Sequence, residues 1–143
     1  MTKLQYIAAG NGVSLAVDAA PANGKPAIIL SNSVGASLGM WDEFVARCSG
    51  DFRIIRYDTR GHGQSQISDE AITIETLGND VLRIMDALEI ERATFCGLSL
   101  GGLTAQWLGV NHAARLDGIV LANTAANFPP ATMWHDRARA VRE

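Results

Sequence analysis

Residues 95–102 read Phe-Cys-Gly-Leu-Ser-Leu-Gly-Gly and place Ser99 between two glycines, where a strand-like apolar run gives way to a helix-like one. A serine hydroxyl is a weak nucleophile at neutral pH. Covalent chemistry therefore requires it on a sharp turn that a base can reach and where backbone N–H groups collect a developing oxyanion. Glycine leaves room for such a turn. The stretch predicts a nucleophile elbow with Ser99 as the nucleophile; the alternative is a serine that serves only the geometry of the turn.

The segments around this turn indicate several strands. Residues 3–9 and 13–19 are alternating runs on either side of Gly10-Asn11-Gly12, a pattern typical of an antiparallel hairpin with a tight turn. Short continuous apolar runs are typical of strands buried on both faces of a parallel sheet. Such runs occupy residues 27–30, 52–57, 93–96 and 118–122.

Helical periods lie between the apolar runs. Apolar residues recur at helical spacing over 76–89 and 100–112, and a shorter helix is expected over 40–48. Strands that alternate with helices predict right-handed crossovers and a mostly parallel sheet with helices on both faces, here preceded by the hairpin. The predicted class is α/β.

The composition limits the kinds of partner. The 143 residues are 48% hydrophobic with a net charge of −3, which fits about one globular domain. The sequence has no basic stripe, so we expect no nucleic-acid partner, and no apolar run of membrane-spanning length, so we expect no membrane partner. Without a signal-like N-terminus the predicted location is the cytoplasm.

Two backbone donors are candidates for an oxyanion hole. The N–H of Leu100 directly follows the nucleophile, which is the usual place of one donor. The second donor is expected from the polar loop after the run at 27–30, and Val34 is the candidate there. The alternative for this loop is a plain polar connection whose side chains cap nearby backbone.

A general base for Ser99 is harder to find. His62 stands between two glycines after the run at 52–57, and a structural role in a tight turn is expected for it. Asp117 and His135 follow Ser99 in the order of a Ser-Asp-His triad, but Asp117 precedes its predicted strand and belongs at the wrong edge of the sheet. No cluster has metal-ligand spacing and no glycine-rich phosphate loop is present, so neither a metal nor a cofactor is expected.

The extended motifs resemble one enzyme family. They are Asn-Ser-Val-Gly at 32–35, Gly-Met-Trp-Asp at 39–42, Arg-Tyr-Asp-Thr-Arg-Gly-His-Gly at 56–63, Gly-Leu-Ser-Leu-Gly-Gly-Leu-Thr at 97–104 and Ala-Asn-Thr-Ala at 122–125. In this order they resemble the 3-oxoadipate enol-lactonases of the α/β-hydrolase superfamily. The resemblance implies cofactor-free hydrolysis of 3-oxoadipate enol-lactone to 3-oxoadipate in bacterial catabolism of aromatic compounds, through an acyl-enzyme on Ser99.

The resemblance also implies that Trp134 and Arg137 begin a lid over the pocket, and we expect Arg137 to bind the substrate carboxylate. The alternative for Arg137 is a solvated charged helix face. Residues 1–128 would form an incomplete core and residues 129–143 the start of the lid.

The family's remaining strands and its catalytic aspartate and histidine belong to the part that would follow Glu143. The resemblance therefore implies an N-terminal half that is inactive alone and works with a complementary C-terminal polypeptide. Two other functions stay open. One is a different carboxylesterase or lactonase on the same scaffold, and the other is a non-catalytic module that binds a small molecule or a partner.

Overall fold

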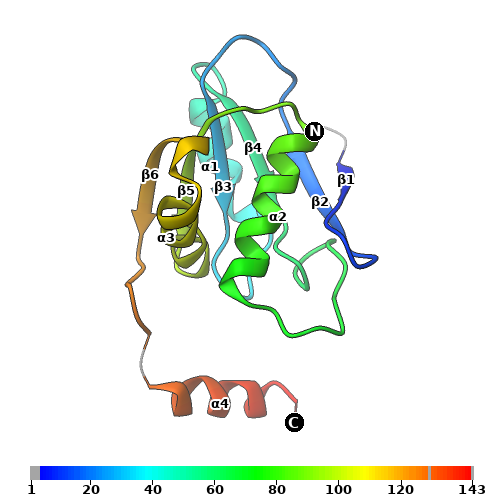
Figure 1. Ribbon diagram of the computed structural model, residues 1–143, viewed down its shortest axis with the longest axis vertical. Coiled ribbons are helices and arrows are strands. Elements are labelled where there is room, and N and C mark those ends of the chain that lie inside the picture. Colours follow the sequence, from blue (N-terminus) through cyan, green and yellow to red (C-terminus); the bar gives the residue numbers. More distant parts are fainter. Residues whose placement is uncertain (1–3, 129, 143) are drawn as a thin grey trace.

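The computed structural model describes residues 4–128 and 130–142 and confirms the predicted α/β class. Within these residues, six strands form one sheet with the order β1-β2-β4-β3-β5-β6 (Figure 1). Lys3, Pro129 and Glu143, at the ends of the predicted first strand and lid segment, lie outside the described residues. The strands are β1 (Gln5–Ala8), β2 (Ser14–Ala19), β3 (Ala27–Ser31), β4 (Arg53–Tyr57), β5 (Ala93–Leu98) and β6 (Leu116–Ala122).

The chain opens with the predicted antiparallel hairpin. β1 pairs with β2 from Gln5 opposite Val17 to Ala8 opposite Ser14. Gly10, Asn11 and Gly12 in the connection all have positive φ, a backbone conformation that glycine and asparagine tolerate best. β2 also pairs antiparallel with β4, so the hairpin extends the parallel part of the sheet.

The other strands form the predicted parallel sheet. β3 pairs with β4 on one side and β5 on the other, and β5 pairs with β6. All five residues of β3 are buried, which is why its sequence is uninterrupted by charge. The carboxyl ends of these strands, at Ser31, Tyr57, Leu98 and Ala122, lie at one edge of the sheet, here called the carboxyl edge.

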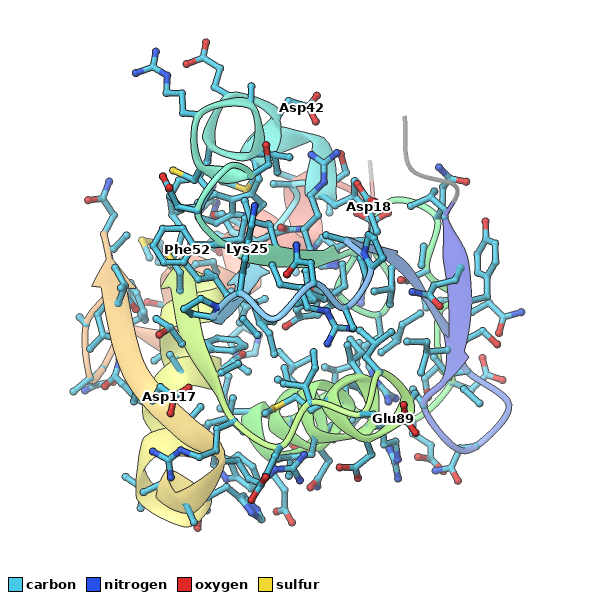
Figure 2. The ribbon with its side chains drawn as sticks, turned by 90° about the horizontal axis from the view of Figure 1, so that it is seen from above. Asp18, Lys25, Asp42, Phe52, Glu89 and Asp117 are labelled. Atoms are coloured by element: carbon cyan, nitrogen blue, oxygen red, sulfur yellow. The ribbon has the colours of Figure 1, made fainter. Side chains whose placement is uncertain are left out.

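Helices cover both faces of the sheet, as predicted. Figure 2 shows α1 (Asp42–Cys48) on one side and α2 (Ile74–Ala87) with α3 (Leu100–Asn111) on the other. The larger apolar core lies under α2 and α3 and includes Ile55, Phe95 and Leu108. A smaller core under α1 is built from Ile28, Leu30, Trp41, Ile54 and Cys96.

Several boundaries differ from the predictions for local reasons. The helix expected over 40–48 is a 3-10 turn, η1 (Leu38–Trp41), followed by α1. α2 begins at Ile74 because the side chain of Thr73 accepts a hydrogen bond from the N–H of Thr76 and closes the helix start. β5 continues to Leu98, since Gly97 and Leu98 still pair with Leu121 and Ala122. A short 3-10 turn, η2 (Ala113–Arg115), precedes β6.

One buried ion pair fastens the carboxyl edge to α2. The guanidinium of Arg60, in the turn after β4, donates to both carboxylate oxygens of Asp80 at 2.7 and 2.5 Å. Their side chains are only 3% and 2% exposed. The pair therefore fixes the turn after β4 against α2.

The last helix, α4 (Ala131–Ala140), is separate from these layers. It crosses beyond the carboxyl edge at the end of an extended stretch (Figure 1). Its residues are exposed apart from Trp134, which is half-buried. Among the described residues, no helix is both long and apolar enough to cross a membrane.

Candidate active site

Ser99 occupies the turn between β5 and α3 in a conformation that L-residues rarely adopt. Its φ is 54° and its ψ is −107°. A non-glycine residue in such a region costs about 1–3 kcal/mol and persists only where its surroundings hold it. Ser99 is the residue before α3, yet its side chain makes no capping hydrogen bond to that helix. The hydroxyl is therefore not used to close the helix start, which weighs against a purely structural serine.

The sharpness of this turn explains the glycines around it. A Cβ on Gly97 would lie 2.1 Å from the carbonyl oxygen of Gly101, and a Cβ on Gly101 would lie 2.4 Å from the carbonyl oxygen of Ser31. Both contacts are with backbone, which has no freedom to move aside. Any larger residue would force β5, α3 or β3 apart.

A cavity of about 240 Å³ opens above Ser99. It is lined by Val34, Ser99, Leu100, Leu103, Phe128 and Trp134. The structure thus brings together four of the five predicted site residues. The wall is apolar apart from the serine, which suits an uncharged group beside the Ser99 hydroxyl.

Two lining residues were not predicted. Leu103 follows Ser99 by four residues, so helical spacing was a signal that places it on the same side of α3. Phe128 lies in an irregular segment where no periodic pattern exists. Its carbonyl accepts a hydrogen bond from the Trp134 indole at 3.3 Å, and the two rings meet edge to face with centroids 6.3 Å apart.

Arg137, the fifth predicted residue, is not among the lining residues. Its guanidinium carbon lies over the Trp134 ring, 5.3 Å from the centroid, and its side chain is exposed. A cation over an aromatic face is attracted by the ring quadrupole. The contact orients Arg137 relative to a residue of the cavity wall while leaving its donors accessible.

The loop that carries Val34 is fastened to both neighbouring strand ends. The Asn32 side chain, fully buried, donates to the carbonyl oxygen of Tyr57 at 3.0 Å and accepts from the indole of Trp41 at 2.8 Å. The carbonyl of Asn32 accepts from the N–H of Gly101 at 3.1 Å. This last bond joins the residue after Leu100 to a residue two before Val34, so it ties together the two segments that carry the candidate oxyanion donors.

A second polar contact joins the carboxyl ends of β3 and β4 inside the protein. The hydroxyls of Ser31 and Tyr57 form a hydrogen bond of 2.8 Å. Burial raises the pKa of Tyr57, so the phenol stays protonated at the end of β4.

The turn after β4 is held by its own polar groups. The Asp58 carboxylate accepts from the N–H of Leu38 at 2.6 Å and from the N–H of Gln64 at 2.8 Å. Nδ1 of His62 lies 3.2 Å from the carbonyl oxygen of Arg60, within the same turn. These contacts agree with the structural role expected for His62.

Asp117 lies at the opposite end of the sheet from Ser99. It is the second residue of β6, not a residue before the strand, and it pairs with Arg92 at 2.7 Å. A larger and more open hollow of about 590 Å³ lies there, lined among others by Lys25, Glu89 and Asp117. Figure 2 labels these three residues in a view of that end of the sheet. Its lining residues carry both positive and negative charges and include no serine or cysteine. Although this hollow is larger, the Ser99 cavity is therefore the better candidate for an active site.

The other histidines lie elsewhere. His112 directly follows α3 and packs on Trp107, with ring centroids 5.2 Å apart, and His135 is an exposed residue of α4. Within residues 4–128 and 130–142, neither a histidine nor a carboxylate lines the Ser99 cavity. The same residues contain no group of three or more His, Cys, Asp or Glu side chains that could hold a metal ion.

The chemistry that these parts suit is attack on a carbonyl carbon. Ser99 stands at the start of α3, where the helix dipole favours negative charge, and Val34 and Leu100 share its cavity. The geometry therefore places the Ser99 hydroxyl and the residues of the two candidate backbone donors around one small apolar space.

Comparison with known proteins agrees with this geometry. Residues 26–143 match the family model described as the alpha/beta hydrolase fold. The chain is 49% identical over 130 residues to 3-oxoadipate enol-lactonase 1 of Acinetobacter baylyi, an alignment that covers 91% of this chain and 48% of the relative. A second enol-lactonase of that organism is 45% identical over 83% of this chain and 45% of its own length.

Among solved structures, the enol-lactonase from Burkholderia xenovorans LB400 superposes with a TM-score of 0.90 at 46% identity. The superposition covers 96% of this chain and 54% of that chain. The chain thus spans about half the length of the relatives it matches.

Proposed function

Since the chain belongs to the alpha/beta hydrolase fold family, we propose that it is the nucleophile-bearing half of a 3-oxoadipate enol-lactonase. The observation that carries the proposal is the single cavity in which Ser99 meets Val34, Leu100 and Trp134. Two relatives named as 3-oxoadipate enol-lactonases, at 49% and 45% identity, support the choice of substrate.

In the proposed reaction Ser99 attacks the carbonyl carbon of the lactone. Its proton passes to a general base, and the carbonyl oxygen becomes an oxyanion that accepts hydrogen bonds from the N–H groups of Val34 and Leu100. The ring C–O bond then breaks, and the enol oxygen leaves with the proton returned by the base. Water, deprotonated by the same base, attacks the acyl-serine and releases 3-oxoadipate, so that Ser99 regains its proton.

The general base and the acid that orients it would come from polypeptide outside the 143 residues. No histidine or carboxylate of the described residues lines the cavity, and the relatives are about twice as long as the aligned part. β6 offers a place for that polypeptide to dock. It lies at the end of the strand order, and its Ile119, Val120 and Leu121 are 39%, 49% and 51% exposed.

An edge strand with three successive exposed apolar residues favours pairing with another strand. In the proposal a strand of the complementary C-terminal polypeptide extends the sheet beyond β6. Its loops would then reach the carboxyl edge, where Ser99 lies.

For substrate binding, Trp134 would form a wall of the pocket and Arg137 would bind the carboxylate of the lactone. A guanidinium binds a carboxylate through two parallel hydrogen bonds. The contact of Arg137 with the Trp134 ring supports this role, because it keeps the cation beside the cavity wall. Residues 129–143 would be the first part of a lid.

The test is hydrolysis by the chain combined with the C-terminal half of the Acinetobacter enol-lactonase. We expect hydrolysis of 3-oxoadipate enol-lactone to exceed that of p-nitrophenyl acetate and to be absent for the chain alone. Preference for the neutral ester would favour a different esterase. If neither substrate is hydrolysed, the proposal is wrong, and a non-catalytic module that binds a small molecule or a partner is favoured instead.

Arg137→Ala tests the carboxylate site in the same mixture. The loss of a charge-assisted hydrogen bond should raise KM for the lactone about 10- to 100-fold and leave KM for p-nitrophenyl acetate unchanged. Arg139→Ala is the matched control, because Arg139 lies on the same helix and pairs with Asp136. Equal effects of Arg137→Ala on both substrates would remove this role.

A further inference from the structure

We propose that Thr124 is a positioning residue that aims the N–H of Leu100 at the oxyanion. Its hydroxyl Oγ1 donates to the carbonyl oxygen of Ser99 at 2.8 Å. That carbonyl and the N–H of Leu100 belong to the same planar peptide unit, so an anchor on the oxygen fixes the direction of the N–H. The inference rests on the proposed function, in which Leu100 supplies an oxyanion donor.

The peptide after Ser99 requires an anchor from outside its own helix. The backbone of Ser99 has a φ of 54° and a ψ of −107°, a strained conformation. Without contacts that hold it, this backbone would change to a more favourable conformation. Its carbonyl also accepts from the N–H groups of Gly102 and Leu103, at 2.9 and 3.2 Å, as the start of α3 demands. Among the described residues, Thr124 is the one hydrogen-bond partner of this oxygen outside α3, and it lies two residues after the end of β6.

The same strand end also holds the other side of Ser99. The N–H of Ser99 donates to the carbonyl oxygen of Ala122 at 3.0 Å. The end of β6 and the residues after it thus grip the nucleophile through both of its backbone groups, once by backbone and once by the Thr124 side chain.

The Thr124 bond has an electronic consequence as well as a geometric one. A hydrogen bond accepted by a carbonyl polarises the peptide and strengthens the N–H of the same unit as a donor, by about 10–30% per bond. The chain of bonds runs from the Thr124 hydroxyl through the Ser99 carbonyl to the N–H of Leu100. Its effect is therefore greatest when the lactone oxygen becomes negative.

Thr124 is itself held without any contribution from substrate. Asn123 has a φ of 43°, which turns the chain sharply after β6. Nε2 of Gln106 donates to the carbonyl oxygen of Ala125 at 3.2 Å and so fastens the loop to α3. Gly102 leaves the space that Thr124 fills, since a Cβ there would lie 2.5 Å from the Thr124 Cβ.

Three variants test the inference. Thr124→Val keeps the shape and removes the hydroxyl, and Thr124→Ser keeps the hydroxyl. Thr104→Val is the matched control, because Thr104 lies on α3 and its hydroxyl donates within the helix, to the Leu100 carbonyl at 3.2 Å. Each variant, combined with the C-terminal half of the Acinetobacter relative, is treated with a fluorophosphonate, whose attack by serine also develops an oxyanion.

We expect the maximal labelling rate constant of Thr124→Val to fall about tenfold, less than the loss of a whole oxyanion donor. The half-saturating concentration should not change, and Thr124→Ser and Thr104→Val should stay close to the unsubstituted chain. A Thr124→Val chain that labels at the original rate would overturn the inference.

An NMR measurement separates this inference from the proposed function. In the 143-residue chain, Thr124→Val should shift the Leu100 amide resonance and speed its hydrogen exchange, and Thr124→Ser should restore both. If the unsubstituted mixture is not labelled, the proposed function fails, and the amide resonance still decides the role of Thr124. An unchanged Leu100 amide in Thr124→Val would overturn that role.

Discussion

The indole of Trp41 donates to the side-chain oxygen of Asn32 across 2.8 Å, and both residues are buried. The bond joins η1 to the loop after β3, which carries Val34. The other side of the Asn32 amide donates to the carbonyl of Tyr57 at the end of β4. The loop is therefore positioned by side chains from two neighbouring segments, and its shape does not depend on its own residues alone.

Trp41→Phe should destabilise the fold through this bond. Phenylalanine keeps an aromatic ring in the smaller core and leaves the Asn32 oxygen buried without its donor, which costs about 1–3 kcal/mol. Urea unfolding followed by circular dichroism measures the change. Trp134→Phe is the matched control, since that indole lies on α4 outside both cores. Equal losses in the two variants would contradict the role of the Asn32 bond.

Asp80→Asn should destabilise the chain far more. The change leaves the Arg60 guanidinium, 3% exposed, without its counter-charge, and breaking a buried pair costs about 3–5 kcal/mol. Asp117→Asn removes the same charge from the half-exposed pair with Arg92, where about 0–1 kcal/mol is expected. Unfolding free energies of the two variants that fall within error of each other would be evidence against the burial argument.

Tyr57 should make stability depend on alkaline pH. Burial raises the pKa of its phenol above the ordinary value of 10.0, so the folded state retains a proton that the unfolded state loses. The contribution is complete below about pH 10 and is lost as the pH rises through the folded-state pKa. Burial raises the pKa of the Cys96 thiol and acts in the same direction.

Thermal unfolding between pH 8 and 11 measures this dependence. We expect Tm to fall above about pH 10, and Tyr57→Phe to flatten that decline while lowering Tm at pH 8, because Ser31 loses its partner. An alkaline slope that is the same in both chains would exclude Tyr57 as its source.

Gly97→Ala should disrupt the elbow itself. The added methyl would lie 2.1 Å from the Gly101 carbonyl oxygen, and relief requires β5 and α3 to separate. Overpacking of this kind costs about 1–3 kcal/mol or more. Gly50→Ala meets nothing within 4 Å and serves as the control. Urea midpoints compare the two, and a Gly97→Ala chain as stable as Gly50→Ala would show that the turn has room to spare.

Much of the fold was predictable because its signals are local. The Gly10-Asn11-Gly12 turn, the uninterrupted apolar run of β3 and the helical spacing of α2 each specify an element without reference to the rest of the chain. The ends of elements were less predictable. β5 extends to Leu98 because β6 pairs with it, and that pairing is a long-range event that no short window of sequence contains.

The site divides in the same way. Ser99 and Leu100 were predictable from one motif, whereas Phe128 entered the cavity only through the path of an irregular segment. Thr124 was recognisable as part of a family motif, but its bond to the Ser99 carbonyl depends on how β6 meets the elbow. The exclusion of Asp117 was predictable from a local signal. A residue near the start of a parallel strand lies at the opposite edge of the sheet from Ser99.

The central claim is that Ser99 is a nucleophile that residues outside this chain activate. Fluorophosphonate labelling followed by peptide mass spectrometry tests it most directly, on the chain alone and on the chain with the C-terminal half of the Acinetobacter relative. We predict a label on Ser99 in the mixture, little or none on the chain alone, and none after Ser99→Ala. A mixture in which Ser99 stays unlabelled, or a label that persists after Ser99→Ala, would contradict the claim.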